Sequence, residues 1–301
     1  MKKFLPKIKI FTLITVCVAF FIAFFCLYSK KPSANSINEN IALTVWQIDS
    51  FEGGKGSRAE YLQNLGNNFG KNENCYITVV SLSAESARLN LSNGNIPDII
   101  SYGAGMFGVE GYINDFTVWC RGSYCLLTLD NSSDFSDTSG ENTVVNKGKD
   151  NYSDVAALFC GLQNAKFESS TSAYVKLING DCKYLLGTQR DIFRLKTRGV
   201  TFSVKPVTTF NDLYQNISKT TNCANVTYAQ KFIDYVVSKK AEISRIGMYC
   251  DGVKLYDDEL SVCESSNYEY TIKYPINEEM KSSIKRGVTL GDINILKELL
   301  K

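Results

Sequence analysis

The loop Ile48–Arg58 (IDSFEGGKGSR) places charged side chains around three glycines. Asp49, Glu52 and Arg58 lie there, between a strand-like run and a helical pattern. Glycine lets the backbone approach a ligand closely, and a helix start offers free N–H donors, so these residues are candidates for binding a polar solute. The GxxxxGK[ST] spacing of a nucleotide-binding loop is absent. A tight turn that needs glycine for positive φ is the alternative interpretation.

Two further segments add candidate ligand-binding side chains. WCRGSYC contributes Trp119 and Tyr124, whose rings could stack on a sugar face, and LLGTQRDIFR contributes Gln189 and Arg190 after a strand-like run. Each has a plainer alternative. Trp119 could belong to the core, and Arg190 could form an ordinary surface ion pair.

Composition excludes several classes of function. The chain has no histidine, which removes Ser-His-Asp and Cys-His catalysis and histidine-ligated metal sites. Thirty-three basic residues balance 31 acidic ones, and no basic stripe marks a nucleic-acid surface. We therefore expect a protein that is not an enzyme, with no cofactor, no metal and no nucleic-acid partner.

The N-terminus has the pattern of a membrane anchor. Ile10 to Ser29 are uncharged, long enough to span a bilayer, and four lysines precede this run. We expect a cytoplasmic segment 1–9, a single transmembrane helix 10–28, a tether 29–40 and an extracellular domain 41–301. The bulky residues after the run argue against signal-peptide cleavage, and Phe24 and Phe25 argue against lipidation of Cys26.

The extracellular part contains eight cysteines. No CxxC pair occurs, so zinc knuckles and redox motifs have no support. Cys120 and Cys125 are the most plausible disulfide by proximity, and separate thiols are an equally good interpretation, since connectivity cannot be deduced from sequence.

The pattern of elements predicts an α/β fold with a largely parallel sheet. Strand, helix and strand alternate from residue 41 to 103, the stretch 104–128 is expected to be the hinge, and the polar run 130–151 an exposed loop. Lobe 1 is expected at about 41–105, and a second lobe with mostly helical C-terminal segments, NDLYQNISKT among them, at about 129–301. The part of the chain after the anchor has about 270 residues, more than a single hydrophobic core usually organises, so two lobes are expected.

The order of these motifs resembles the family-1, maltose-binding-like solute-binding proteins of ABC transporters from Gram-positive bacteria. The segments that carry the resemblance are TVWQIDSFEGGKGSRAEYL, NGNIPDIISYG, WCRGSYCLLTL, AYVKLINGDCKYLLGTQRDIFRL, NDLYQNIS, YAQKFIDYVVS and IGMY. The resemblance implies a two-lobed periplasmic-binding-protein-like (type II) fold that closes over a small solute, usually a carbohydrate, and delivers it to a permease. It also implies ligand-binding roles for Asp49, Glu52, Arg58, Trp119, Tyr124, Gln189 and Arg190. The chain departs from the group in its shorter length and in having an anchor in place of a lipobox.

The leading hypothesis is thus extracellular capture of a sugar or oligosaccharide by lobe closure, in partnership with permease subunits. A degenerate, membrane-tethered relative that acts as an interaction or sensory subunit is the alternative. A glycosidase with a carboxylate pair is the third, and no motif supports it.

Overall fold

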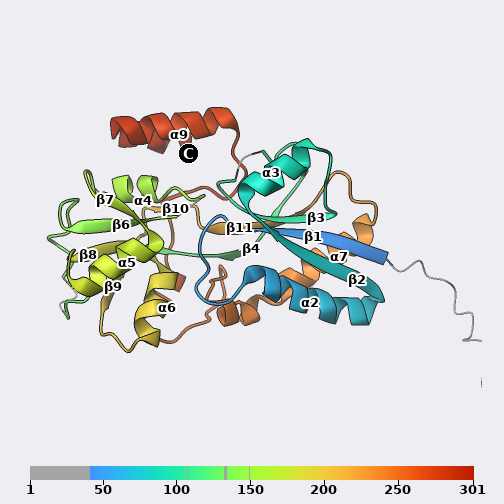
Figure 1. The fold of residues 1–301 in the computed structure, drawn as a ribbon, viewed down its shortest axis with the longest axis horizontal. Helices are drawn as coiled ribbons and strands as arrows, with labels where there is room; N and C mark the ends of the chain where they lie inside the picture. Colours follow the sequence, from blue (N-terminus) through green and yellow to red (C-terminus); the bar gives the residue numbers. More distant parts are fainter. Residues whose placement is uncertain (1–40, 107, 132–133, 149) are drawn as a thin grey trace, which may run out of the picture. The chain divides into compact units, whose positions relative to one another are not determined.

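The computed structural model describes residues 41–106, 108–131, 134–148 and 150–301. The anchor and tether predicted within residues 1–40 lie outside the described residues. From Ala42 onward the chain is one compact unit, and no helix within the described ranges is long and apolar enough to cross a membrane. Two five-stranded sheets divide this unit into two lobes (Figure 1).

Lobe 1 is built on a mixed sheet in the order β2-β1-β3-β11-β4. β1 and β3 run parallel, whereas β11 is antiparallel to both β3 and β4. The strands alternate with helices along the N-terminal half, because the apolar runs of β1 and β3 can be buried only if helices cover the sheet. The elements of lobe 1 are β1 (Ile41–Ile48), α2 (Arg58–Glu73), β2 (Cys75–Leu82), α3 (Ala84–Ser92), β3 (Ile99–Gly103), β4 (Thr117–Arg121), β11 (Tyr214–Lys219), α7 (Val226–Ser238) and the 3₁₀ segment η1 (Lys240–Ile246).

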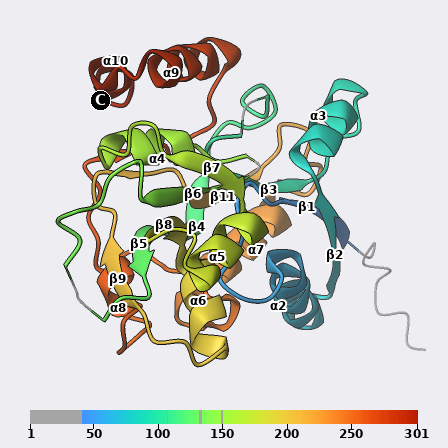
Figure 2. The ribbon, with the colours of Figure 1, turned by 60° about the vertical axis from the view of Figure 1, so that its left-hand side comes forward.

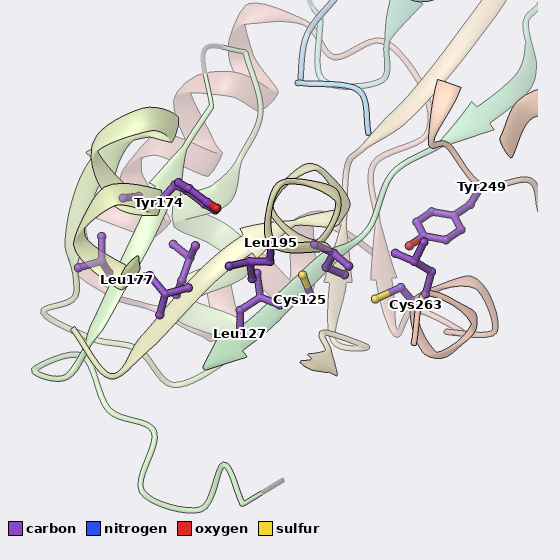
Figure 3. Close-up of a cluster of buried hydrophobic side chains, with 12 residues drawn as sticks. Cys125, Leu127, Tyr174, Leu177, Leu195, Tyr249 and Cys263 are labelled. Atoms are coloured by element: carbon purple, nitrogen blue, oxygen red, sulfur yellow. The ribbon is translucent and has the colours of Figure 1, made fainter. Parts of the chain in front are cut away.

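Lobe 2 repeats the arrangement with the order β7-β6-β8-β5-β9. β6 is parallel to β7 and β8, and β5 is antiparallel to β8 and β9. Its core lies between the sheet and the helices α5 and α6, as Figure 3 shows for the side chains around Leu127, Leu177 and Leu195. The elements are β5 (Tyr124–Thr128), β6 (Thr143–Lys147), α4 (Ser153–Phe159), β7 (Lys166–Ser169), α5 (Ser170–Asn179), β8 (Tyr184–Thr188), α6 (Gln189–Thr197) and β9 (Ser203–Pro206).

The chain passes between the lobes more than once. β4 continues into β5 through Gly122 and Ser123, and the return runs from β9 through β10 (Phe210–Asn211) to β11. These two crossings are hydrogen-bonded to each other: Asn211 Nδ2 donates to the Gly122 carbonyl at 3.0 Å, and Gly122 N donates to the Leu213 carbonyl at 2.6 Å. The first crossing therefore lies inside the stretch 104–128 that the sequence indicated for the hinge.

The C-terminal segment connects both lobes and then forms a helical pair. α8 (Ser261–Glu264) packs near β9, and β12 (Tyr270–Thr271) pairs in parallel with β10. The last two helices, α9 (Glu278–Leu290) and α10 (Ile293–Leu299), pack on each other and on α4 of lobe 2 (Figure 2).

Three expectations need correction. NDLYQNISKT contains strand β11 instead of a helix, because residues 214–218 are all buried between β3 and β4, where sheet hydrogen bonds override helical propensity. The run 130–151 is not all exposed loop, since β6 is buried next to β8. The assignment of 129–301 to the second lobe is wrong for β11 and α7, because the second crossing returns the chain to the sheet of lobe 1.

Candidate functional site

The loop between β1 and α2 is held in place by close backbone contacts. Lys55 N donates to the Ile246 carbonyl at 2.9 Å, and a Cβ on Gly54 would lie 2.0 Å from the carbonyl oxygen of Gly247. Only glycine permits that approach. Ser57 then caps α2, with its Oγ accepting from Glu60 N at 3.3 Å.

Arg58 stabilises this loop from inside. Its side chain is 3% exposed, its Nε lies 2.7 Å from Asp49 Oδ1, and its guanidinium stacks 4.4 Å from the Phe51 ring centroid. It also donates to the Phe51 carbonyl, and Gln47 Nε2 donates to Asp49 Oδ1 at 2.8 Å. The predicted residues Asp49 and Arg58 therefore form a pair that fixes the loop, with Asp49 as its more exposed member.

Glu52 extends from the same loop to lobe 2. Its Oε2 accepts a hydrogen bond from Ser170 Oγ at 2.6 Å and lies 3.0 Å from Arg190 Nε and 3.5 Å from Arg194 Nη2. We call these four residues the Glu52 cluster. All are partly exposed to solvent, so each ion pair on its own stabilises the contact by less than about 1 kcal/mol.

The lobe 2 side of the cluster stands at two helix starts. Ser170 is the first residue of α5, and Arg190 is the second residue of α6. Thr188 and Asp191 form a capping box that fixes α6, with Thr188 N donating to Asp191 Oδ2 at 3.1 Å. Asp191 is fully buried, also accepts from Asn146 Nδ2 at 3.0 Å, and pairs with Arg194 at 3.1 Å. Burial raises the pKa of Asp191.

Trp119 does not fit its predicted role as a solute-stacking residue. It is 0% exposed, its indole Nε1 donates to Ser101 Oγ at 3.0 Å, and its ring stacks on Tyr61 of α2 at 6.0 Å between centroids. The sheet of lobe 1 and α2 enclose the indole. Trp119 therefore fits the alternative interpretation, in which it belongs to the core.

Tyr124 and Gln189, like Trp119, are buried and make hydrogen bonds within the chain. Tyr124 is 1% exposed and donates through its hydroxyl to Asp212 Oδ1 at 2.8 Å. Gln189 is fully buried at the first crossing, where its Oε1 accepts from Ser123 N at 3.0 Å. Their buried hydrogen bonds hold Tyr124 at Asp212 of the second crossing and Gln189 at Ser123 of the first crossing, so neither side chain belongs to the Glu52 cluster.

Of the seven predicted residues, the structure thus brings Glu52 and Arg190 together across the lobes and pairs Asp49 with Arg58 within the loop, whereas Trp119, Tyr124 and Gln189 lie outside the Glu52 cluster. Sequence reasoning missed Ser170 and Arg194. Arg194 follows Arg190 by one helical turn, so an i,i+4 reading of the α6 pattern places both guanidiniums on one helix face. No sequence pattern predicts a site role for Ser170, because its position depends on the direct junction between β7 and α5.

The donor set of the site is polar and charged. Within the described ranges, no group of three or more His, Cys, Asp or Glu residues lies close enough to hold a metal ion. On the lobe 2 side, donors of Arg190, Arg194 and Ser170 converge on one carboxylate oxygen, Oε2 of Glu52.

Comparison with known proteins gives similarity at the level of the fold. No protein-family model matches the chain, and no curated protein is similar to it. The Trichodesmium protein FutA (IdiA), solved with iron and citrate ligands, has a TM-score of 0.58 at 13% identity, over 86% of this chain and 100% of that one. Iron-bound HitA from Pseudomonas aeruginosa has a TM-score of 0.53 at 12% identity, over 82% and 99%. A substrate-binding domain described for a molybdenum ABC transporter from Clostridium difficile has a TM-score of 0.50 at 14% identity, over 69% and 98%.

These likenesses and the two mixed sheets show a two-lobed α/β fold of the type II periplasmic-binding-protein kind. None of the three structures is described as a sugar-binding protein. They therefore give the maltose-binding-like group no support over other groups with this fold.

Proposed function

We propose that the two-lobed domain is the solute-binding component of an ABC transporter, which holds a small polar solute between its lobes and passes it to permease subunits. In this proposal the protein binds the solute reversibly and forms or breaks no covalent bond. The fold supports this proposal, since the similar structures include a transporter's substrate-binding domain and proteins solved with bound iron.

The observation that carries the proposal is the Glu52 cluster. The crossings that join the lobes are buried and satisfied within the chain, as Gln189 and Asn211 illustrate. By contrast, Glu52, Arg190 and Arg194 meet across the lobes while partly exposed. Polar groups that converge from two lobes are what a solute site at a lobe interface requires.

The chemistry of the cluster favours an anionic solute. Arg190, Arg194 and Ser170 hold a carboxylate oxygen of Glu52, and a solute carboxylate of the same geometry can take the same donors. The carbohydrate specificity expected from sequence rested on the family resemblance and, among the residues, on Trp119 and Tyr124, both of which are buried. We therefore propose a small carboxylic acid, or an acid-chelated metal, in place of a sugar.

The location and the partner complete the proposal. An anchor at residues 10–28 would keep the domain at the outer face of the cell membrane, where a permease can receive the solute. The charge-free run and the preceding lysines support this arrangement.

A second candidate is a tethered interaction or sensory subunit that has lost solute binding. One observation favours it: the arginines of lobe 2 already have a carboxylate partner within the chain, namely Glu52. A screen of the full chain in detergent by thermal unfolding separates the two. The panel contains citrate, ferric citrate, molybdate, amino acids and maltose.

Transport function predicts that at least one acid raises the unfolding temperature, since a ligand at about 100 times its Kd adds about 2.7 kcal/mol. Arg190→Gln should abolish that rise, while Arg245→Gln, a change at an exposed arginine of η1, should not. A rise with maltose alone would restore the carbohydrate hypothesis, and no rise with any compound would favour the tethered subunit.

A further inference from the structure

Four of the eight described cysteines gather where the chain crosses between the lobes. Cys120 and Cys125 lie on β4 and β5, on either side of Gly122 and Ser123. Cys250 and Cys263 lie on residues 247–264, which lead from η1 to the end of α8 and which we call the returning segment. All four side chains are buried.

Backbone register places Cys120 opposite Cys250. Arg121 N donates to the Tyr249 carbonyl at 3.0 Å, and Tyr249 N donates to the Arg121 carbonyl at 2.9 Å, so these two residues form a hydrogen-bonded antiparallel pair. This bridge is isolated, and continuing its antiparallel register by one residue sets Cys120 opposite Cys250, at a non-hydrogen-bonded position where Cα atoms are typically about 4.5 Å apart. That spacing lies at the short end of the range of about 4.4 to 6.8 Å that disulfides occupy.

Cys125 and Cys263 are in direct side-chain contact. Both are 0% exposed and belong to the same core cluster of lobe 2, with the two sulfur atoms shown in Figure 3. Their thiols share a hydrogen bond, and that bond lowers the pKa of Cys263. The contact joins β5 to α8.

We propose that Cys120 bonds to Cys250 and that Cys125 bonds to Cys263, so that two disulfides tie the returning segment to the first crossing. This inference rests on the proposed extracellular location, because disulfides persist in oxidising compartments. Each bond forms by loss of two protons and two electrons from a thiol pair to an exchanging disulfide, such as oxidised glutathione, which becomes two thiols. Because the sulfurs are buried, the exchange takes place during folding.

The two bonds leave the lobes free to move relative to each other. Cys120 and Cys250 lie on the lobe 1 side of Gly122, and Cys125 and Cys263 lie on the lobe 2 side of Ser123. Neither bond joins the two sheets. The inference also replaces the Cys120–Cys125 pairing that the sequence left open, because those residues belong to strands of different sheets.

Peptide mapping tests the pairing independently of any solute. The full chain is refolded in detergent with a glutathione redox couple, then denatured and alkylated without reduction so that any free buried thiol is labelled, and cut with trypsin. Arg121 and Lys254 are cleavage sites that separate all four cysteines into different peptides. We expect the Cys120 peptide linked to the Cys250 peptide, and the Cys125 peptide linked to the Cys263 peptide.

Matched variants control the result. Cys75→Ser, at a buried cysteine far from the crossings in sequence, should leave both links unchanged, whereas Cys250→Ala should leave Cys120 alkylated and keep the second link. Reduction should lower the unfolding temperature of the wild type and not that of the variant with all four cysteines changed to Ala. Alkylated Cys120 and Cys125 in oxidised, folded protein would overturn the inference, and so would a Cys120–Cys125 link.

Discussion

Glu52 Oε2 of lobe 1 lies 3.0 Å from Arg190 Nε of lobe 2, and Arg194 and Ser170 contact the same oxygen. The pair matters because it joins the β1–α2 loop of lobe 1 to α6 of lobe 2 outside the buried crossings, next to the hydrogen bond from Arg190 Nη1 to the Gly53 carbonyl at 3.5 Å. It also identifies the cationic groups of lobe 2, Arg190 and Arg194, that hold a carboxylate within the chain.

Glu52→Gln tests whether Glu52 competes with an acidic solute. The change removes the negative charge that the two arginines hold, so the affinity for citrate should rise, while the free energy of unfolding should fall by no more than about 1 kcal/mol, as for exposed ion pairs. Titration calorimetry and denaturant unfolding measure the two effects. Glu242→Gln, at an ion pair of η1, is the matched control. A loss of citrate affinity in Glu52→Gln would instead make Glu52 a direct solute contact.

Trp119→Ala should damage the fold of lobe 1. Removing a fully buried indole that stacks on Tyr61 should cost about 3 to 5 kcal/mol of unfolding free energy. Trp119→Phe should cost clearly less because most of the volume remains. The measurement is the denaturant midpoint, with solute affinity determined on the folded fraction. Unchanged stability together with lost affinity would restore the solute-stacking role.

Gly54→Ala should distort the loop that presents Glu52. The new Cβ would lie 2.0 Å from the Gly247 carbonyl, and such overpacking typically costs about 1 to 3 kcal/mol. Gly111→Ala is the control, since nothing lies within 4 Å of the position of its Cβ. The denaturant midpoint reports the loss in both variants. Equal midpoints for the two would contradict the close approach.

Asp212 should make stability depend on pH. The carboxyl is buried at the second crossing, accepts from Tyr124 and from Tyr152 N at 2.7 Å, and burial raises its pKa from 3.8 to about 6. A pKa that is higher in the folded state contributes stability below the unfolded pKa, and this contribution is lost as the pH rises through about 6. The raised pKa corresponds to about 3 kcal/mol over the whole titration, of which about 2 kcal/mol is lost between pH 4 and pH 7.

Asp212→Asn removes this titration, so its unfolding free energy should vary less than that of the wild type over the same pH range. Asp234→Asn, on the exposed face of α7, should retain the wild-type profile. Identical pH profiles for wild type and Asp212→Asn would refute the assignment.

The α/β class and the glycine loop could be predicted from sequence because both depend on local pattern. β1, β2 and β3 follow apolar runs that end at turn residues, and α2 follows a serine cap. β11 could not be predicted as a strand, because the burial of its polar residues Gln215 and Asn216 depends on partners far away in the sequence. Gln215 Nε2 donates to the Ile48 carbonyl at 3.1 Å, and Asn216 Nδ2 donates to the Lys273 carbonyl at 2.8 Å.

The site was partly predictable for a similar reason. Glu52 and Arg190 stand at the ends of strands, where sequence order indicates ligand contact. Trp119 and Tyr124 have the residue types of a sugar site, but type does not reveal which face of a strand is buried. The register between β11 and β4 shifts between Gln215 and Asn216, which makes Trp119 the extra residue of a bulge in β4, and no pattern in the sequence indicates this shift.

Titration of the full chain with citrate, in the wild type and in Arg190→Gln/Arg194→Gln, tests the proposed function most directly. The account predicts saturable binding at one site, weakened by about tenfold or more in the double variant, because each charge-assisted hydrogen bond contributes about 1.5 to 3 kcal/mol. Citrate binding that is unchanged in the double variant, or saturable binding of maltose with none of citrate, would contradict it.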